Sequence, residues 1–367
     1  MKIIDRVLIA VFCLFIFGFG IAFAVSPKST FSVNEKRSLA EMPAATLDGI
    51  FNGQFESGFE TYINDHFPAR ESFAALDAYY ALFTGRNGSN GIYKGKDGYL
   101  FAEPPGHDEK IISDNIEALR SFANNTKIMS TLMIIPSGGY IMSEKLPANH
   151  LEYRDGETLA EIRSRVESDI RWVDVEAKFL NAKESGQIYY KTDHHYTTYG
   201  AYLAYEAFCG EHGLTPFKDY TIERYDGFYG TSYSTSALWN EPAESFEVWR
   251  YPSNASVEIN GTAYPSLWFD EHLEEPDKYP VFLNGNQPFE RIINPDVEGG
   301  KILVLKDSYA HAMIPFLAQH YHQIDMVDLR YYFEPVSELV RENQYGEIFM
   351  IYGLSSVCDD TDIAILE

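Results

Sequence analysis

Residues 301–310 have the sequence KILVLKDSYA, in which an apolar run ends in three polar residues. The apolar run predicts a buried strand, and residues 309–321 predict a helix. Ser308 falls on the turn between them. If the strand belongs to a parallel sheet, this turn lies at its carboxyl end, where ligands bind. The alternative is that Ser308 merely caps the helix.

Strand-like and helix-like segments alternate along the chain from about residue 109 onward. This alternation predicts an α/β fold in which helices flank a parallel sheet. Residues 215–298 interrupt it, and their many Tyr, Pro, Asn and Gly residues predict an insertion of loops and short strands. The expected helices lie at 110–124, 156–168, 176–184 and 199–212, the last capped by Thr198, and the expected strands at 128–135, 172–175, 187–190, 323–329 and 347–352.

The N-terminal segment contains an uncharged run, residues 7–25, that is long enough to cross a bilayer. Lys2 and Arg6 precede the run, which predicts that the rest of the chain lies outside the cytoplasm. A cleaved signal peptide is the alternative, because residues 22–24 read AFA. Under either interpretation the chain from residue 28 is exported, so we expect a single-pass cell-membrane protein, or a secreted protein if cleavage occurs.

These features divide the chain into three parts. Residues 1–27 are the expected membrane anchor or signal peptide, and residues 28–90 a tether and helical segment. Residues 91–367 are the expected catalytic domain, with the insertion at about 215–298.

Composition narrows the classes of ligand. The net charge of −25 disfavours nucleic acid as a partner. The 26 Tyr residues suit a carbohydrate ligand, because aromatic faces stack on sugar rings, but a Tyr-rich core explains them equally well. Of three cysteines, Cys13 lies in the apolar run, while Cys209 and Cys358 either form a disulfide or remain free thiols. The spacing of the cysteines does not suggest a metal site.

Residues 192–196, TDHHY, form a second polar cluster between a predicted strand and a predicted helix. In an extended segment, Asp193 and His195 point to the same side. The carboxylate can then orient the imidazole, and the imidazole can activate a serine hydroxyl. A zinc site that recruits His320 and His322 is an alternative, as is a polar helix start.

The two clusters together resemble a known family. Residues 192–201, TDHHYTTYGA, look like the signature of the DHHW proteins, with Tyr196 where the name expects Trp. Further segments that resemble this family are NEKRSLAEMP (34–43), YINDHFPAR (62–70), GIYKGKDGYLF (91–101) and KILVLKDSYA (301–310). The family is similar to the SGNH-hydrolase-like proteins of alginate O-acetylation.

The resemblance implies an SGNH-hydrolase-like fold with Asp193 as orienter, His195 as general base and Ser308 as nucleophile. It implies O-acetyl transfer onto a cell-surface or secreted polysaccharide, with a membrane-bound O-acyltransferase as the partner that supplies acetyl groups. A carbohydrate acetylesterase with the same triad, or a non-catalytic glycan-binding or assembly protein of the same fold, are the alternatives. No cofactor is expected.

Residues 230–234, GTSYS, resemble the nucleophile motif of the alginate proteins more closely than KDSYA does. Ser308 is nevertheless preferred, because residues 222–230 are predicted to form a loop, and no apolar strand precedes Ser232. A serine on a loop lacks the fixed main-chain donor that an oxyanion needs.

Candidates for oxyanion or substrate contacts are Asn286, Gly230, Arg330 and Tyr196. Asn286 would donate from its side chain and Gly230 from its main chain, although turn chemistry explains both residues equally well. Arg330 would bind an acidic group of the substrate, unless it forms a surface salt bridge.

Overall fold

The structure is a computed structural model that describes residues 3–366. The chain divides into two compact units. One comprises Met1–Asn90 with Tyr233–Asn240, and the other comprises Gly91–Ser232 with Glu241–Glu367. The second unit contains the main sheet and the candidate site.

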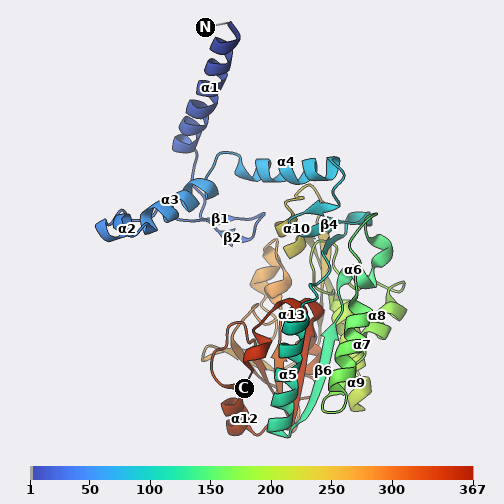
Figure 1. Cartoon of the computed structure of the whole chain (residues 1–367). Helices are drawn as coiled ribbons and strands as arrows, with labels where there is room; N and C mark the ends of the chain where they lie inside the picture. Colours follow the sequence, from blue (N-terminus) through green and yellow to red (C-terminus); the bar gives the residue numbers. More distant parts are fainter. Residues whose placement is uncertain (1–2, 367) are drawn as a thin grey trace. The chain divides into compact units, whose positions relative to one another are not determined.

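The main sheet has eight strands in the order β11-β10-β12-β14-β13-β15-β6-β7. One of them, β6, is labelled in Figure 1. The five strands from β14 to β7 are parallel, as the alternation predicts. These strands are β6 (Met129–Ile135), β7 (Arg171–Trp172), β13 (Lys301–Lys306), β14 (Gln323–Val327) and β15 (Glu347–Gly353). This unit is therefore an α/β fold built on a sheet whose central strands are parallel.

The helices of this unit flank the sheet. They are α5 (Glu109–Thr126), α6 (Gly138–Ile141), α7 (Asp155–Val166), α8 (Val175–Ala182), α9 (Thr198–His212), α11 (Ala310–Leu317), α12 (Val336–Asn343) and α13 (Leu354–Asp359). A further helix, α10 (Thr231–Ser236), begins in this unit and ends in the other. Short 3-10 turns occupy Lys96–Gly98, Ser143–Lys145, Asp270–Glu274, Tyr279–Val281 and Ile363–Ile365.

Two apolar cores lie on opposite faces of the sheet. Successive side chains of β15 alternate between them: Phe349 and Ile351 belong to the core that includes α9 and α11, and Ile348 belongs to the core that includes α5 and α7. Cys209 lies in the first core and Cys358 in the second. All three cysteines are free thiols, so the sheet separates the pair that the sequence offered as a disulfide.

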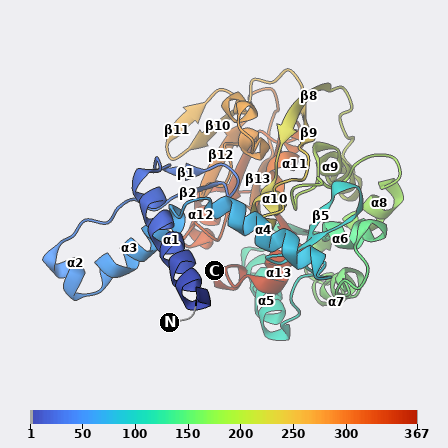
Figure 2. The ribbon, with the colours of Figure 1, turned by 90° about the horizontal axis from the view of Figure 1, so that it is seen from above.

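The predicted insertion extends the main sheet. Its strand β12 (Phe289–Ile293) pairs antiparallel with β14, β10 (Ser256–Ile259) pairs antiparallel with β12, and β11 (Thr262–Tyr264) pairs antiparallel with β10. Figure 2 shows these three strands next to one another at one end of the sheet. Two further strands, β8 (Thr221–Phe228) and β9 (Glu244–Arg250), form a separate antiparallel pair. The prediction of a loop over residues 222–230 is therefore wrong for 222–228, where pairing with β9 makes a strand.

The segment 91–101 forms a hairpin, in which β4 (Ile92–Lys94) pairs with β5 (Leu100–Ala102). Residues 187–190, in contrast, do not form the predicted strand. Their β pairing within the described chain is an isolated antiparallel bridge between Tyr189 and Tyr196.

In the first unit, α1 (Ile3–Val25) is the single described helix with the length and apolar composition to span a bilayer. The unit also contains α2 (Leu47–Phe51), α3 (Gln54–Asp65), α4 (Arg70–Phe83) and the paired strands β1 (Phe31–Ser32) and β2 (Arg37–Ser38), while β3 (Gly88–Ser89) ends it. Two segments that resemble the DHHW family meet here. The Arg37 guanidinium binds Asp65 at 2.5 Å and lowers the pKa of that carboxyl to about 2.

Candidate active site

Ser308 lies on the turn between β13 and α11, at the carboxyl end of a central strand. Asp307 fixes this turn. Its Oδ1 accepts from the main-chain N–H of Tyr309 (2.9 Å), and its Oδ2 accepts from the N–H of Gly353 (2.6 Å) and the hydroxyl of Ser356 (2.8 Å). The turn is thus tied to the end of the neighbouring strand β15. Ser308 itself is partly exposed, as a nucleophile must be.

Asp193 and His195 lie on the segment that precedes α9. The Tyr189–Tyr196 bridge closes this segment into a tight loop, and Thr197 begins the helix by accepting a hydrogen bond from Gly200 N–H at 3.1 Å. Thr197 is therefore the cap, one residue earlier than predicted.

The three predicted triad side chains meet. His195 Nδ1 lies 2.6 Å from Asp193 Oδ1, and His195 Nε2 lies 2.7 Å from Ser308 Oγ. Asp193 and His195 are buried. Because a carboxylate only accepts, Nδ1 donates to Asp193 and leaves Nε2 to accept from the serine hydroxyl. The arrangement can remove a proton from Ser308.

Asp193 accepts two further hydrogen bonds. The main-chain N–H of His195 donates to Oδ1 at 2.8 Å, and that of Thr231 donates to Oδ2 at 2.6 Å. Gly230 allows this approach, because a Cβ on it would lie only 2.1 Å from the Cβ of Asp193. The N–H of Gly230 donates to Thr192 Oγ1 at 3.1 Å, so the structure gives it a part in holding the loop instead of binding an oxyanion.

Glu244, at the start of β9, holds the other side of the loop. Its carboxylate accepts from Lys191 N–H (2.9 Å), from Thr192 N–H (2.7 Å) and from the Thr192 hydroxyl (2.7 Å). Burial raises the pKa of Glu244, and the donated hydrogen bonds oppose that shift. The insertion thus positions the loop that presents Asp193 and His195.

Two tyrosines enclose the imidazole of His195. Tyr279 stacks on it with ring centroids 4.0 Å apart and planes 12° apart, and Tyr309 meets it edge-on at 5.1 Å. Tyr279 also donates from its hydroxyl to the main-chain oxygen of Ser308 at 3.0 Å, and Tyr309 donates to that of His194 at 2.7 Å. Each tyrosine therefore links the His195 loop to the Ser308 turn.

The remaining predicted site residues lie outside this cluster. Asn286 is exposed, and its side chain makes no hydrogen bond to the triad within residues 3–366. Arg330 donates to both oxygens of the buried Asp328, at 2.8 and 2.6 Å, so it serves a buried ion pair. The main-chain N–H of Ser308, in contrast, has no acceptor within the described chain, and it is the better oxyanion donor.

The proposal of Tyr196 as a substrate contact is wrong. Its side chain has no exposed surface, and its hydroxyl donates to the main-chain oxygen of Tyr309. The residue after the two histidines therefore packs beneath the site and joins its two halves.

A metal ion would have to compete with the triad. Ligand atoms of Asp193, His194 and His195 lie within 4.8 Å of one another, but His195 uses one ring nitrogen toward Asp193 and the other toward Ser308. The two histidines that the metal alternative would recruit lie elsewhere. His320 contacts the Tyr205 hydroxyl at 2.6 Å, and His322 approaches main-chain carbonyls.

Residues 111–327 match the family model of the DHHW proteins, which covers more than half of the chain. The chain belongs to the DHHW family. Among curated proteins, a probable alginate O-acetylase AlgJ of Pseudomonas syringae pv. tomato is 26% identical over 180 residues, 46% of this chain and 45% of that protein. Its Azotobacter vinelandii counterpart is 26% identical over 164 residues. This DHHW protein thus spans less than half the length of the curated relatives that it matches.

Two solved structures of other proteins superpose on this chain over most of their length. A DHHW family protein from Eubacterium siraeum superposes with a TM-score of 0.65 at 22% identity, over 76% of this chain and 95% of that one. Bacillus cereus PatB1 superposes with a TM-score of 0.61 at 21% identity, over 74% of this chain and 98% of that one. At such identities the likeness shows the DHHW fold alone.

Sequence reasoning missed three residues that position the site. Asp307 adjoins Ser308, and an Asp at the start of a turn is a signal for side-chain acceptance of nearby N–H groups. Glu244 and Tyr279 carry no local signal. Both residues belong to the insertion, and only tertiary folding brings them to the loop that carries Asp193 and His195.

Proposed function

We propose that this DHHW protein is an extracytoplasmic O-acyltransferase in which Ser308 carries an acetyl group to a hydroxyl of a cell-surface or secreted polysaccharide. The observation that carries the proposal is the pair of contacts at 2.6 and 2.7 Å that connects Asp193, His195 and Ser308. That the matched relatives are named alginate O-acetylases supports the choice of acetyl and of polysaccharide.

The chemistry runs in two balanced steps. His195 Nε2 takes the proton of Ser308 as Oγ attacks the acetyl carbonyl of the donor, and the protonated imidazole then returns that proton to the leaving oxygen. An acetyl–Ser308 ester remains. In the second step His195 takes a proton from a sugar hydroxyl, whose oxygen attacks the ester, and Ser308 leaves as its hydroxyl. Asp193 stabilises the imidazolium in both steps.

The main-chain N–H of Ser308 supports both steps. It has no acceptor among the described residues and adjoins the reacting oxygen, so it can donate to the carbonyl oxygen as negative charge develops there. Tyr279 contributes indirectly, because it stacks on the imidazole and holds the main chain of Ser308.

The apolar helix α1 supports a proposal about the place of the protein in the cell. We infer that α1 anchors the chain with residues 28–90 as a tether and 91–367 as the catalytic domain outside the cytoplasm. Lys2 and Arg6 at the start of the chain support this orientation. A membrane-bound O-acyltransferase is the partner that would present acetyl groups on that side.

The test is turnover of p-nitrophenyl acetate by the full chain in phospholipid nanodiscs. Ser308→Ala should lower kcat/KM by at least about 10³-fold, since the nucleophile is lost, whereas Ser232→Ala should retain turnover. Mass spectrometry after treatment with a sulfonyl fluoride should place the adduct on Ser308. Loss of turnover in Ser232→Ala alone would overturn the assignment of the nucleophile.

A second arm separates transfer from hydrolysis. Acetylated oligosaccharide should accumulate when a glycan acceptor is added to the acetyl ester. If acetate is the sole product at saturating acceptor, water is the physiological acceptor and the protein is an esterase.

A further inference from the structure

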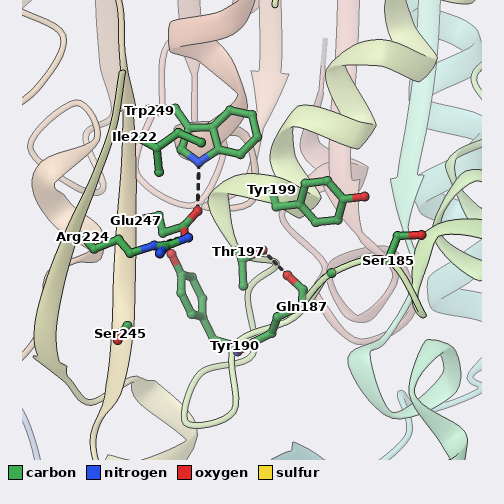
Figure 3. Close-up of a pocket in the computed structure, with 11 residues that line it drawn as sticks. Ser185, Gln187, Tyr190, Thr197, Tyr199, Ile222, Arg224, Ser245, Glu247 and Trp249 are labelled. Atoms are coloured by element: carbon green, nitrogen blue, oxygen red, sulfur yellow. Dashed lines mark hydrogen bonds and ion pairs between the residues drawn. The ribbon is translucent and has the colours of Figure 1, made fainter. Parts of the chain in front are cut away.

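A cavity of about 390 Å³ lies beside the loop that carries Asp193 and His195, within the larger unit (Figure 3). One wall is the β8–β9 pair of the insertion, and the other comprises the start of α9 and the segment 185–190. The side chains that line it include Gln187, Tyr190, Tyr199, Arg224, Glu247 and Trp249.

The strand wall presents an aromatic surface and a charged pair on one face. Trp249 lies opposite Ile222, and Glu247 lies opposite Arg224, in the antiparallel register. Glu247 accepts from Arg224 Nε at 2.8 Å and from the Trp249 indole N–H at 3.0 Å. The indole is thereby held in place, half-buried, with Tyr199 across from it at a ring-centroid distance of 6.4 Å.

The floor holds the buried hydroxyl of Tyr190. Tyr190 is 2% exposed, and the polar side chain next to its Oη is that of Thr198. The nearby Thr198 hydroxyl donates to the main-chain oxygen of Glu247. In Figure 3 the Tyr190 ring points toward Arg224 and Glu247. Because Thr198 uses its proton toward Glu247, the Tyr190 hydroxyl can still donate its own proton to an oxygen of a ligand.

These features fit a sugar ring better than other ligands. An aromatic face offers stacking to the C–H face of a pyranose, and the surrounding amide, carboxylate and guanidinium groups both donate and accept, as sugar hydroxyls require. Burial raises the pKa of the Tyr190 phenol well above its usual range, so its hydroxyl remains a donor. Because Glu247 neutralises Arg224, the cavity has no excess charge, which favours an uncharged sugar.

The cavity adjoins the proposed catalytic loop. Tyr190 and Thr197 line it, and they stand three residues before Asp193 and two after His195. Three residues of chain span at most about 10 Å. Tyr190 also lines a smaller hollow that reaches Asp193 and His194. An occupant of the cavity therefore lies close to the triad without touching it.

We propose that this cavity binds a neutral pyranose unit of the glycan, at a subsite beside the one where the acetyl group is transferred. The inference rests on the proposed function for the role of that glycan as acceptor. Binding itself does not require acyl transfer, so the two can be tested separately.

The experiment measures binding to the full chain in nanodiscs, with Ser308→Ala introduced so that no transfer occurs. The probes are cellotetraose, maltotetraose and chitotetraose, with tetramannuronate as the charged comparison. At least one neutral probe should bind and should change the fluorescence of Trp249. Adding Trp249→Ala should weaken that binding at least 10-fold, while Trp249→Phe should restore part of it.

Two conservative variants and one control complete the design. Tyr190→Phe removes a single hydroxyl, and Arg224→Ala changes an exposed side chain, so both should fold normally and weaken binding three-fold or more. Trp172→Ala, another half-buried tryptophan that does not line this cavity, should bind within two-fold of the parent.

Three results would overturn the inference: no neutral probe binds, Trp249→Ala binds as well as the parent, or tetramannuronate binds most tightly. If the protein binds a neutral probe but does not turn over p-nitrophenyl acetate, the result would instead refute acyl transfer. The proposal of a sugar-binding subsite would then still hold.

Discussion

Two serine-containing segments of this DHHW protein look alike in sequence and differ in structure. Ser308 in KDSYA lies on the turn between β13 and α11, whereas Ser232 in GTSYS lies within α10. Ser308 is partly exposed and lies 2.7 Å from His195 Nε2. Ser232 is 2% exposed, and its Oγ is buried without a hydrogen-bond partner in the described chain. The motif alone does not make a nucleophile, because exposure and the position of the base decide it.

The GTSYS segment, residues 230–234, has a different role in the site. Its Thr231 N–H binds Asp193 Oδ2, and Gly230 gives Asp193 room. The GTSYS segment thus contacts Asp193, the proposed orienter of the base, while the KDSYA segment carries Ser308, the proposed nucleophile. Four substitutions test this division of roles, in order of decreasing expected effect.

Asp193→Asn should be the most damaging. Three N–H donors converge on the two carboxylate oxygens, and an amide has one acceptor oxygen, so it must leave a donor unpaired or favour the wrong tautomer of His195. We expect kcat for p-nitrophenyl acetate to fall about 10³- to 10⁴-fold. A loss smaller than ten-fold would mean that Asp193 does not orient the base.

Gly230→Ala should separate Asp193 from Thr231, since the new Cβ would lie 2.1 Å from Asp193 Cβ. We expect kcat/KM to fall at least ten-fold and the free energy of unfolding to fall by about 1–3 kcal/mol. The matched control is Gly210→Ala in α9, where no atom lies within 4 Å of the new Cβ. In this control, activity should be unchanged and stability equal or higher by up to about 1 kcal/mol. Equal behaviour of the two variants would remove Gly230 from the site.

Tyr279→Phe should have a moderate effect. It retains the ring that stacks on His195 and deletes the hydroxyl that donates to Ser308 O. The free energy of unfolding should drop by about 1 kcal/mol, which is the contribution of a typical hydrogen bond. The turnover number should fall several-fold. Tyr279→Ala, which also removes the stack, should cost more in kcat than in KM. The two variants can be compared by steady-state kinetics and thermal unfolding.

Ser232→Ala should have the smallest effect and the opposite sign for stability. It deletes a buried oxygen that has no partner among residues 3–366, so the free energy of unfolding should stay the same or rise by about 1 kcal/mol. Chemical denaturation measures this directly. Clear destabilisation would show that Ser232 Oγ has a partner in solution and would weaken the contrast with Ser308.

The place of Ser308 at the carboxyl end of a parallel strand could be predicted from the local sequence pattern. The strand expected at 187–190 does not form, so the meeting of Asp193 and His195 with Ser308 was implied by the family resemblance and does not follow from a shared sheet edge. The strand over 221–228 could not be predicted in the same way. Its sequence, TIERYDGF, is mostly polar and exposed, and it is a strand because β9 pairs with it. Glu244 and Tyr279 were missed for the same reason, because the insertion meets the site through tertiary contacts.

Successive side chains of β9 face opposite sides of the strand. Phe246 and Val248 face the core, whereas Ser245, Glu247 and Trp249 face the cavity of Figure 3. If the cavity binds a glycan as proposed, substitutions on the outer face should change ligand preference while the inner face stays packed in the core. A combinatorial library restricted to those outer positions would then yield variants with different glycan preferences.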